Sequence, residues 1–151
     1  MIRIFAVSMV FALIFGGPAM AQSPVEITAD NFTVDESSSE AVFTGNVVVV
    51  HPSVTVYAPT VTVLYGAGGT SDIESFVATG NVRLESPGQV ATGERAVFDP
   101  AVRTLRLTGN VVVDNASGQV RGPELLVDLN TNVSTFTSGT GNRVTGTFTT
   151  Q

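Results

Sequence analysis

Three aspartates stand at the ends of short apolar segments and are the first candidates for acid–base chemistry. They are Asp35, Asp99 and Asp128, and each is preceded by a short strand-like segment: Phe32-Thr33-Val34, Ala96-Val97-Phe98 and Leu125-Leu126-Val127. Two carboxylates hydrolyse a glycosidic bond when they face one another across a cleft. These three occupy equivalent places in repeated units of the chain, so we expect them in a row along one rim of the fold. We interpret them as residues that cap turns and not as a catalytic pair.

Few other side chains could carry out chemistry. His51 is the only histidine and the chain has no cysteine, so the ligands of a transition-metal site are lacking. We interpret His51, which precedes Pro52, as a surface or edge residue at the end of a strand. Ser37, Ser38 and Ser39 form a solvated loop without a basic partner. The sequence therefore predicts a protein that is not an enzyme and that uses neither a cofactor nor a metal.

A repeated phrase shows how the chain is organised. Thr-Gly-Asn-Val occurs at 44–47, 79–82 and 108–111, and a degraded fourth copy at 140–143 has arginine in place of valine. A phrase that returns at this period indicates stacked copies of one small unit. Glycine and asparagine tolerate positive φ, so we interpret each Gly-Asn pair as a tight turn or bulge between apolar strands.

The unit around each phrase has the pattern of β-structure. Apolar residues alternate with polar ones, for example Leu105 and Leu107 on one face with Arg106 on the other. Pairs of short strands are expected at 25–28 and 32–35, 54–57 and 61–64, 89–92 and 96–99, and 119–122 and 125–128. We predict an all-β fold of repeated antiparallel strands with one apolar face.

The first 21 residues have the features of a secretory signal peptide. Arg3 precedes an apolar stretch at 4–15, and Ala19-Met20-Ala21 is the small-x-small pattern at which signal peptidase cuts. We expect cleavage after Ala21 and export to the periplasm, with residues 22–151 forming one domain. An uncleaved membrane anchor is the alternative, although the stretch is shorter than the roughly 20 residues of a typical membrane-spanning helix.

The charge of the chain argues against two classes of partner. The formal net charge is −6 at pH 7, lysine is absent, and the arginines are single and scattered. Nucleic acids and anionic membrane surfaces attract proteins that carry clustered positive charge. We therefore expect no nucleic-acid partner.

Together these features resemble the OstA-like domain family of lipopolysaccharide transport proteins. The resemblance lies in the strands that end in Asp35, Asp99 and Asp128, in the repeated Gly-Asn-Val, and in the segment 25–30 directly after the signal peptide. The terminal segment 141–148 is similar to the way in which such domains often end. The resemblance implies a twisted, open β-jelly roll with an apolar groove along its length.

The resemblance also implies a function. Proteins of this family form a bridge that carries lipopolysaccharide from the inner to the outer membrane for outer-membrane assembly. It implies binding of lipid A acyl chains and contact with an LptC-like protein anchored in the inner membrane and an LptD-like protein in the outer membrane. The alternatives are an LptC-like or other component of the same bridge, a structural β-filament without a ligand, and an enzyme on a repetitive β-scaffold.

We predict the residues of the groove from the alternation of the strands. They are the apolar residues expected on the inward face: Ile27, Phe32, Val34, Phe43, Val63, Phe76, Leu84, Phe98, Leu105, Leu107, Val113, Leu125 and Val127. An open stack of strands also leaves an unpaired edge at each end, and such an edge can pair with another chain. We expect head-to-tail self-association through Val25 and Ile27 at one edge and Val144 and Phe148 at the other.

Overall fold

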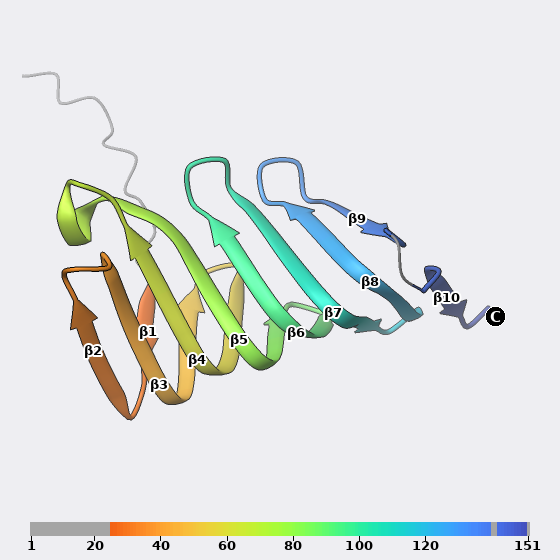
Figure 1. The fold of residues 1–151 in the computed structure, drawn as a ribbon. Helices are drawn as coiled ribbons and strands as arrows, with labels where there is room; N and C mark the ends of the chain where they lie inside the picture. The colour runs from red at the N-terminus through yellow and green to blue at the C-terminus, as the bar shows by residue number, and fades with distance from the viewer. Residues whose placement is uncertain (1–24, 140–141, 151) are drawn as a thin grey trace, which may run out of the picture.

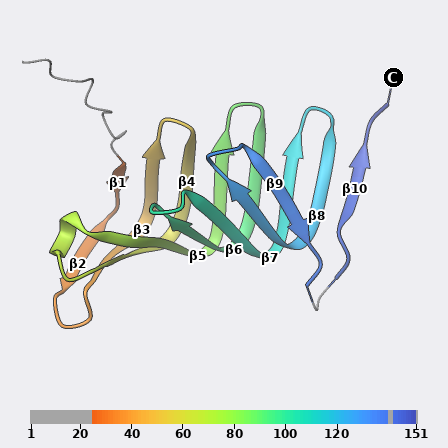
Figure 2. The ribbon, with the colours of Figure 1, turned by 90° about the horizontal axis from the view of Figure 1, so that it is seen from above.

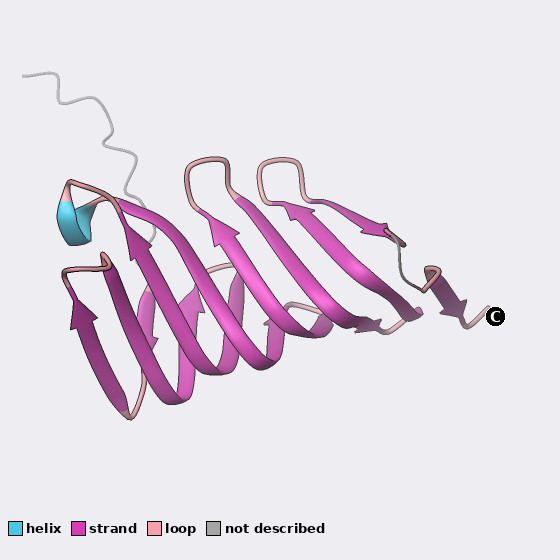
Figure 3. Ribbon diagram, viewed as in Figure 1, coloured by secondary structure: helices cyan, strands magenta, loops and turns pink. Residues whose placement is uncertain are grey.

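The computed structural model describes residues 25–139 and 142–150, which form one antiparallel sheet of ten strands (Figure 1). The strands are β1 (Glu26–Thr28), β2 (Asn31–Asp35), β3 (Glu40–His51), β4 (Val54–Tyr65), β5 (Ile73–Ser86), β6 (Gln89–Asp99), β7 (Thr104–Asn115), β8 (Gly118–Asp128), β9 (Val133–Thr137) and β10 (Thr145–Phe148). The only helical element in this part of the chain is the 3-10 turn η1 (Gly69–Ser71) between β4 and β5 (Figure 3). The predicted all-β fold is confirmed.

Two predictions fall on residues that the structure does not describe. The signal peptide expected at 1–21 and the start of the fourth phrase, at 140–141, both lie outside the described residues. Within 25–139 and 142–150, no helix has the length and apolar character needed to cross a membrane.

The sheet is a meander in which neighbours in the chain are neighbours in space. From β3 to β8 the strand order follows the sequence, and Figure 1 shows these strands side by side. β1 and β2 both pair with β3, and β9 and β10 both pair with β8. The ten strands therefore occupy eight positions, with β1 and β2 sharing the first and β9 and β10 sharing the last.

The long strands bend at the repeated Gly-Asn pairs. These pairs lie inside β3, β5 and β7, and the pairing register shifts at each of them. Gly45, Gly80 and Gly109 have φ of +84°, +94° and +82°, a region that residues with a side chain rarely adopt. A β-bulge bends the strand that carries it. The interpretation of the Gly-Asn pairs as bulges is therefore confirmed.

The expected pairs of short strands are, in most of the chain, single long strands. The segments 54–57 and 61–64 both belong to β4, and β6 and β8 likewise each join two predicted strands. Pro59 and Pro123 lie at the bends of β4 and β8, where the ladder is already interrupted and a residue without an N–H is tolerated. Only at the first position is the predicted pair separate, as β1 and β2.

The bends fold the sheet into two arms that face one another. Arm A contains β2, β9 and residues 40–44, 60–65, 73–79, 95–99, 104–108 and 124–128. Arm B contains β1, β10 and residues 47–51, 54–58, 82–86, 89–93, 111–115 and 118–122. Figure 2 shows the two arms as separate layers in a view from above.

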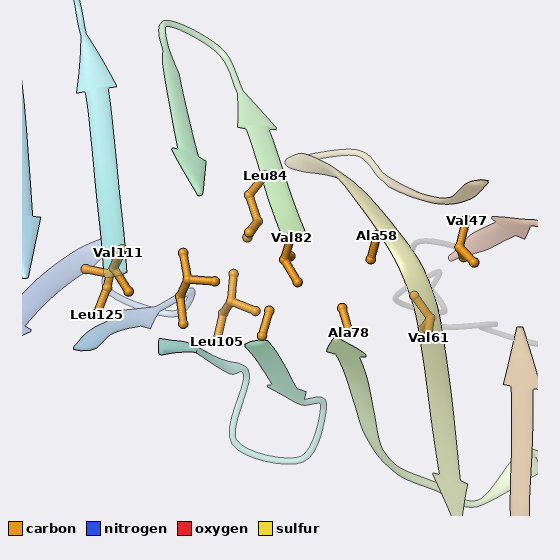
Figure 4. Packing of buried hydrophobic residues seen from close by; sticks show 11 residues of the cluster. Val47, Ala58, Val61, Ala78, Val82, Leu84, Leu105, Val111 and Leu125 are labelled. Carbon is orange, nitrogen blue, oxygen red and sulfur yellow. The ribbon is translucent and has the colours of Figure 1, made fainter. Parts of the chain in front are cut away.

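The core lies between the arms. Val61 and Leu107 of arm A and Val47, Val82 and Val111 of arm B are each at most 1% exposed. Figure 4 shows buried side chains of both arms pointing into the same space. Burial of this apolar surface is the main favourable term that holds the arms together, because the chain has no cysteine to form a disulfide.

Aspartates close three turns between strands of arm A. Oδ1 of Asp35 accepts hydrogen bonds from the backbone N–H groups two and three residues later, and Asp99 and Asp128 do the same, at 2.8–3.4 Å. The fourth residue after each aspartate has a positive φ of 56°. The prediction that these three acids cap turns is confirmed. The β4–β5 connection lacks this aspartate and contains η1 instead.

Candidate functional site

Cross-strand pairing aligns the apolar residues in strips that run across the sheet, because directly paired residues lie on the same face. Strip 1, in arm A, consists of Phe32, Phe43, Val61, Ala78, Ala96, Leu107, Leu125 and Phe136. Strip 2, also in arm A, consists of Val34, Ala41, Val63, Phe76, Phe98, Leu105, Val127 and Ser134. Strip 3, in arm B, consists of Ile27, Val49, Val56, Leu84, Ala91, Val113, Val120 and Gly146.

The strips give the molecule an inner face that is apolar from one edge of the sheet to the other. Adjacent strands are about 4.8 Å apart, so a strip that crosses eight positions is about 30 Å long. Phe32 and Phe136 stand at the two ends of strip 1. Strip 1 is therefore apolar up to both edges of arm A.

Two cavities lie between the arms along this inner face. The first has a volume of about 70 Å³, and its walls include Val49 of arm B and Phe76 and Phe98 of arm A. The second has a volume of about 240 Å³ and lies nearer β8 and β9, where Val113 and Phe136 face it from opposite arms.

The two cavities are neighbouring parts of one groove. Val54, Leu105 and Leu129 line both of them. Val54 belongs to arm B, Leu105 to arm A, and Leu129 to the turn between β8 and β9. We call the combined space the groove.

Eight of the thirteen residues predicted for the groove line one of its cavities. They are Phe76, Leu84, Phe98, Leu105, Leu107, Val113, Leu125 and Val127. The other five belong to strips 1 to 3 but border neither cavity: Ile27, Phe32, Val34, Phe43 and Val63. All thirteen therefore lie on the inner face, and their part in binding a ligand stays a prediction.

Two of the predicted groove residues are more exposed than a lining role suggests. Phe32 is 57% exposed and Val34 is 43% exposed. Both lie on β2, which pairs only with β3 within the described residues, so water reaches them from the open side. The Phe32 ring still contacts Phe43, with 4.6 Å between ring centroids.

The two predicted edges are present in the described part of the chain. There, β1 pairs only with β3, and β10 pairs only with β8. Val25, Val144 and Phe148 are 37%, 39% and 62% exposed. Ile27 is instead half-buried, because it lies at the end of strip 3 and packs against the core.

Sequence reasoning missed several residues of the groove. Leu129 lies in a turn, where alternation gives no face, and yet it lines both cavities. Ser53, Ser86 and Gln89 give the second cavity a polar border at the ends of arm B. His51, expected as a surface or edge residue, is the last residue of β3; it is half-buried there and also lines the first cavity, which the sequence did not predict. Its direct pairing with Val54, which is apolar, is the signal that could have placed it.

Positive charge lies on the opposite, outer face of the sheet. Arg83, Arg95 and Arg106 alternate with inward residues, and no arginine is among the residues that line the cavities. Arg83 pairs with Glu85 at 2.8 Å and Arg106 with Glu124 at 3.3 Å. Because these pairs are partly solvated, each contributes little to stability. The groove is therefore an apolar site without a cationic anchor.

The carboxylate of Asp35 serves its own turn. Asp35 has a pKa below its ordinary value because the Ser37 hydroxyl and the backbone N–H groups of Ser37 and Ser38 donate hydrogen bonds to the carboxylate. Within 25–139 and 142–150, no three His, Cys, Asp or Glu side chains form a group that could hold a metal ion.

The bent antiparallel sheet with its apolar groove defines the class of protein as a twisted, open β-jelly roll. Residues 26–133 match the family described as LptA/(LptD N-terminal domain) LPS transport protein. This match covers more than half of the chain, so the chain belongs to this LptA-like family, whose members are transport proteins and not enzymes.

Individual proteins are also similar to the chain. An uncharacterized protein of Rhizobium meliloti (strain 1021) is 35% identical over 115 residues, which are 72% of this chain. The matched region spans 62% of the length of that relative. The crystal structure of LptH from Pseudomonas aeruginosa superposes with a TM-score of 0.72, covering 85% of this chain and 96% of LptH at 19% identity. LptH is described as the LptA-homologous periplasmic component of the lipopolysaccharide transport device, and the likeness shows a shared fold.

Proposed function

We propose that this chain is a periplasmic carrier of lipopolysaccharide on its way from the inner to the outer membrane. The observation that carries the proposal is the groove between the arms, which is lined mainly by apolar side chains. Membership of the LptA-like family supports the same ligand. In this proposal the acyl chains of lipid A occupy the groove, and the chain reaches the periplasm after cleavage behind Ala21.

The groove meets the physical requirement of such a carrier. Burial of one methylene is worth about 0.8 kcal/mol, so an acyl chain of roughly a dozen carbons costs on the order of 10 kcal/mol to expose to water. Strips about 30 Å long offer such a chain an apolar surface from one edge of the sheet to the other. Shielding of this kind requires no catalytic residue.

The charge distribution determines which part of the lipid the groove can hold. Buried phosphates need charged partners, because an unpaired charge is costly to remove from water. The residues that line the two cavities include no arginine, and Arg83 and Arg106 are paired on the outer face. We therefore place the acyl chains inside the groove and the phosphates of lipid A outside it.

The strand count supports head-to-tail assembly of several such domains. The eight positions alternate in direction, so the last position of one molecule is antiparallel to the first position of the next. Pairing of β9 and β10 with β2 and β1 of a second copy would bring Phe136 beside Phe32 and continue strip 1. A contact of this kind does not close on itself and gives short filaments.

The same edges suit partners that carry the same domain. An LptC-like protein at the inner membrane and an LptD-like protein at the outer membrane would extend the sheet by strand addition. The grooves of consecutive domains would then form one apolar path between the membranes. This part of the proposal rests on the exposed edges at Val25 and Phe148.

Photo-crosslinking in cells tests the ligand and its location. A crosslinking amino acid at Val113, which lines the second cavity, is expected to capture lipopolysaccharide. The matched control is Val112, the next residue of β7, which lies on the outer face and pairs with Arg121. Equal amounts of adduct from the two positions would refute the groove as the binding site. If neither position gives an adduct, the carrier function itself is refuted.

A further inference from the structure

One side chain in the lining of the groove stands out by its chemistry. His51 is the last residue of β3 and lies on the inner face opposite Val54. The other residues that line the first cavity are all apolar, and those of the second cavity are apolar or neutral. His51 is therefore the only lining side chain that can carry a charge or act as a ring N–H donor.

A hydrogen bond determines which ring nitrogen carries the proton. Nδ1 of His51 accepts a hydrogen bond from the backbone N–H of Ser53 at 3.2 Å. When the imidazole is neutral, one nitrogen accepts and the other donates, so this hydrogen bond favours the tautomer with the proton on Nε2. Within the described residues, no group accepts a hydrogen bond from this Nε2–H. The ring is thus fixed to the β3–β4 turn through one nitrogen and keeps a free donor on the other.

The place of His51 in the lining of the groove suits one group of an acylated lipid. An acyl chain held between apolar walls ends in the carbonyl group that joins it to the polar headgroup. His51 stands where the apolar wall of arm B ends and the exposed turn residues Pro52 and Ser53 begin. We propose that His51 donates a hydrogen bond from Nε2 to the carbonyl oxygen of an acyl ester or amide, and so recognises the linkage of the lipid. This inference rests on the proposed use of the groove for acyl chains.

A carbonyl oxygen suits this place better than a charged group does. The site supplies a single ring N–H donor, and no arginine lines the cavity to hold a phosphate there. A neutral hydrogen bond at a half-buried position costs little desolvation and discriminates against a ligand that lacks the acceptor. His51 thereby sets how deep an acyl chain enters, because its carbonyl stops at the ring.

Two matched lipids separate recognition of the carbonyl from apolar binding. Palmitoyl-lysophosphatidylcholine has an ester carbonyl, and its hexadecyl ether analogue has the same chain and headgroup without it. Displacement of a fluorescent apolar dye, below the micelle concentration, gives the affinity of the native protein for each lipid. We expect the ester to bind about five- to tenfold more tightly, the effect of one neutral hydrogen bond.

Three variants then separate the two roles of the imidazole. His51→Asn keeps an oxygen that can accept the Ser53 N–H in an Asx-turn, but it lacks the reach of Nε2. His51→Gln places an amide N–H near the position of Nε2 and gives up the turn contact. His51→Leu gives up both groups. We expect Gln to retain most of the preference for the ester, and Asn and Leu to bind the two lipids equally.

The outcomes distinguish this inference from the proposed function. A native protein that binds both lipids with equal affinity would overturn the role of His51 and leave the acyl-binding groove intact. An Asn variant that keeps the full ester preference would show that His51 serves only the turn. A native protein that binds neither lipid would overturn the groove as an acyl site, and His51 recognition with it.

Discussion

The ring of Pro59 lies directly against the backbone of Gly80 where β4 and β5 bend together. A Cβ atom added to Gly80 would be 2.7 Å from Cγ of Pro59, closer than real Cβ contacts allow. At the corresponding bend of β7, Nδ2 of Asn110 donates a hydrogen bond to Oε1 of Glu94 at 3.0 Å. A Cβ atom added to Gly109 at that bend would likewise be too close to the Glu94 side chain. At both bends a glycine therefore leaves room for a side chain of the preceding strand. The bends in turn produce the two arms that enclose the groove.

The contact between Pro59 and Gly80 predicts a costly glycine substitution. Gly80→Ala combines a φ of +94° with a clash against a rigid pyrrolidine ring. We expect a loss of about 2–3 kcal/mol in the free energy of unfolding, measured by urea denaturation.

The control for this substitution is Gly88→Ala. Gly88 has a similar φ of +81°, but a Cβ there would meet nothing within 4 Å. We expect a loss of only about 1 kcal/mol from the backbone conformation alone. In the double variant Pro59→Ala/Gly80→Ala, the loss in the free energy of unfolding should be close to that smaller value. Equal losses in Gly80→Ala and Gly88→Ala would mean that packing against Pro59 does not define the bend.

The capped turn between β2 and β3 predicts a pH-dependent stability. The pKa of Asp35 is lowered in the folded state by hydrogen bonds from Ser37 and Ser38, so its ionised form stabilises the fold above the unfolded pKa of about 4. That contribution is lost as the pH falls through the lowered folded pKa. Thermal melts between neutral and strongly acidic pH should show Asp35→Asn less stable than the native chain at neutral pH and equal to it in acid.

Ser37→Ala is the companion variant for this prediction. It removes the largest cause of the lowered pKa while Asp35 can still titrate. Its pH dependence should lie between those of the native chain and of Asp35→Asn. Parallel pH profiles for all three proteins would contradict a stabilising role for the Asp35 carboxylate.

Filling the second cavity should block the ligand and spare the fold. Ala91 is half-buried in strip 3 and lines this cavity of about 240 Å³. In Ala91→Phe the ring occupies space that an acyl chain would use. Keeping only two methylenes of that acyl chain out of the cavity already weakens binding roughly tenfold. We expect the unfolding free energy to change by less than about 1.5 kcal/mol, because the cavity accommodates the added volume.

Thr92→Phe is the matched control for the filled cavity. Thr92 is the next residue of β6, and it lies on the outer face, paired with Arg83. Displacement of an apolar dye by lipid should be unchanged in this variant. A loss of binding that is equal in both variants would point to a general disturbance of β6 and not to a blocked groove.

A charge at the first edge should prevent self-association. Phe32 is 57% exposed on β2, and Phe32→Arg would place an unpaired charge at the end of strip 1, where a second copy is proposed to pair. Sedimentation over a concentration series should show a monomer at concentrations where we expect the native chain to form filaments. The stability cost should stay within about 1 kcal/mol, set by the lost contact with the Phe43 ring.

Val102→Arg tests whether any exposed apolar residue would give the same result. Val102 is 55% exposed in the turn between β6 and β7, away from both edges of the sheet. This variant should associate as the native chain does. Filaments of Phe32→Arg as long as those of Val102→Arg would show that the first edge is not the joint.

The local features of this protein could be predicted from its residues alone. Alternation placed Leu105 and Leu107 on one face and Arg106 on the other, because the side-chain period of a strand is fixed by the backbone. The turns after Asp99 and Asp128 were predictable for a similar reason, since each aspartate bonds to backbone only two and three residues away. The repeated phrase and the family resemblance rested on the same short-range patterns.

How these local pieces join depends on contacts between residues that are far apart in the sequence. Whether Gly80 and Asn81 end a strand or bend it depends on hydrogen bonds to β4 and β6, which are distant in sequence. The groove exists because the bends bring arm A against arm B. The cavities lie where side chains of the two arms do not reach one another. The part of His51 in the groove could not be predicted for that reason: no pattern near residue 51 reveals that Val25, Phe76 and Phe98 line the same cavity.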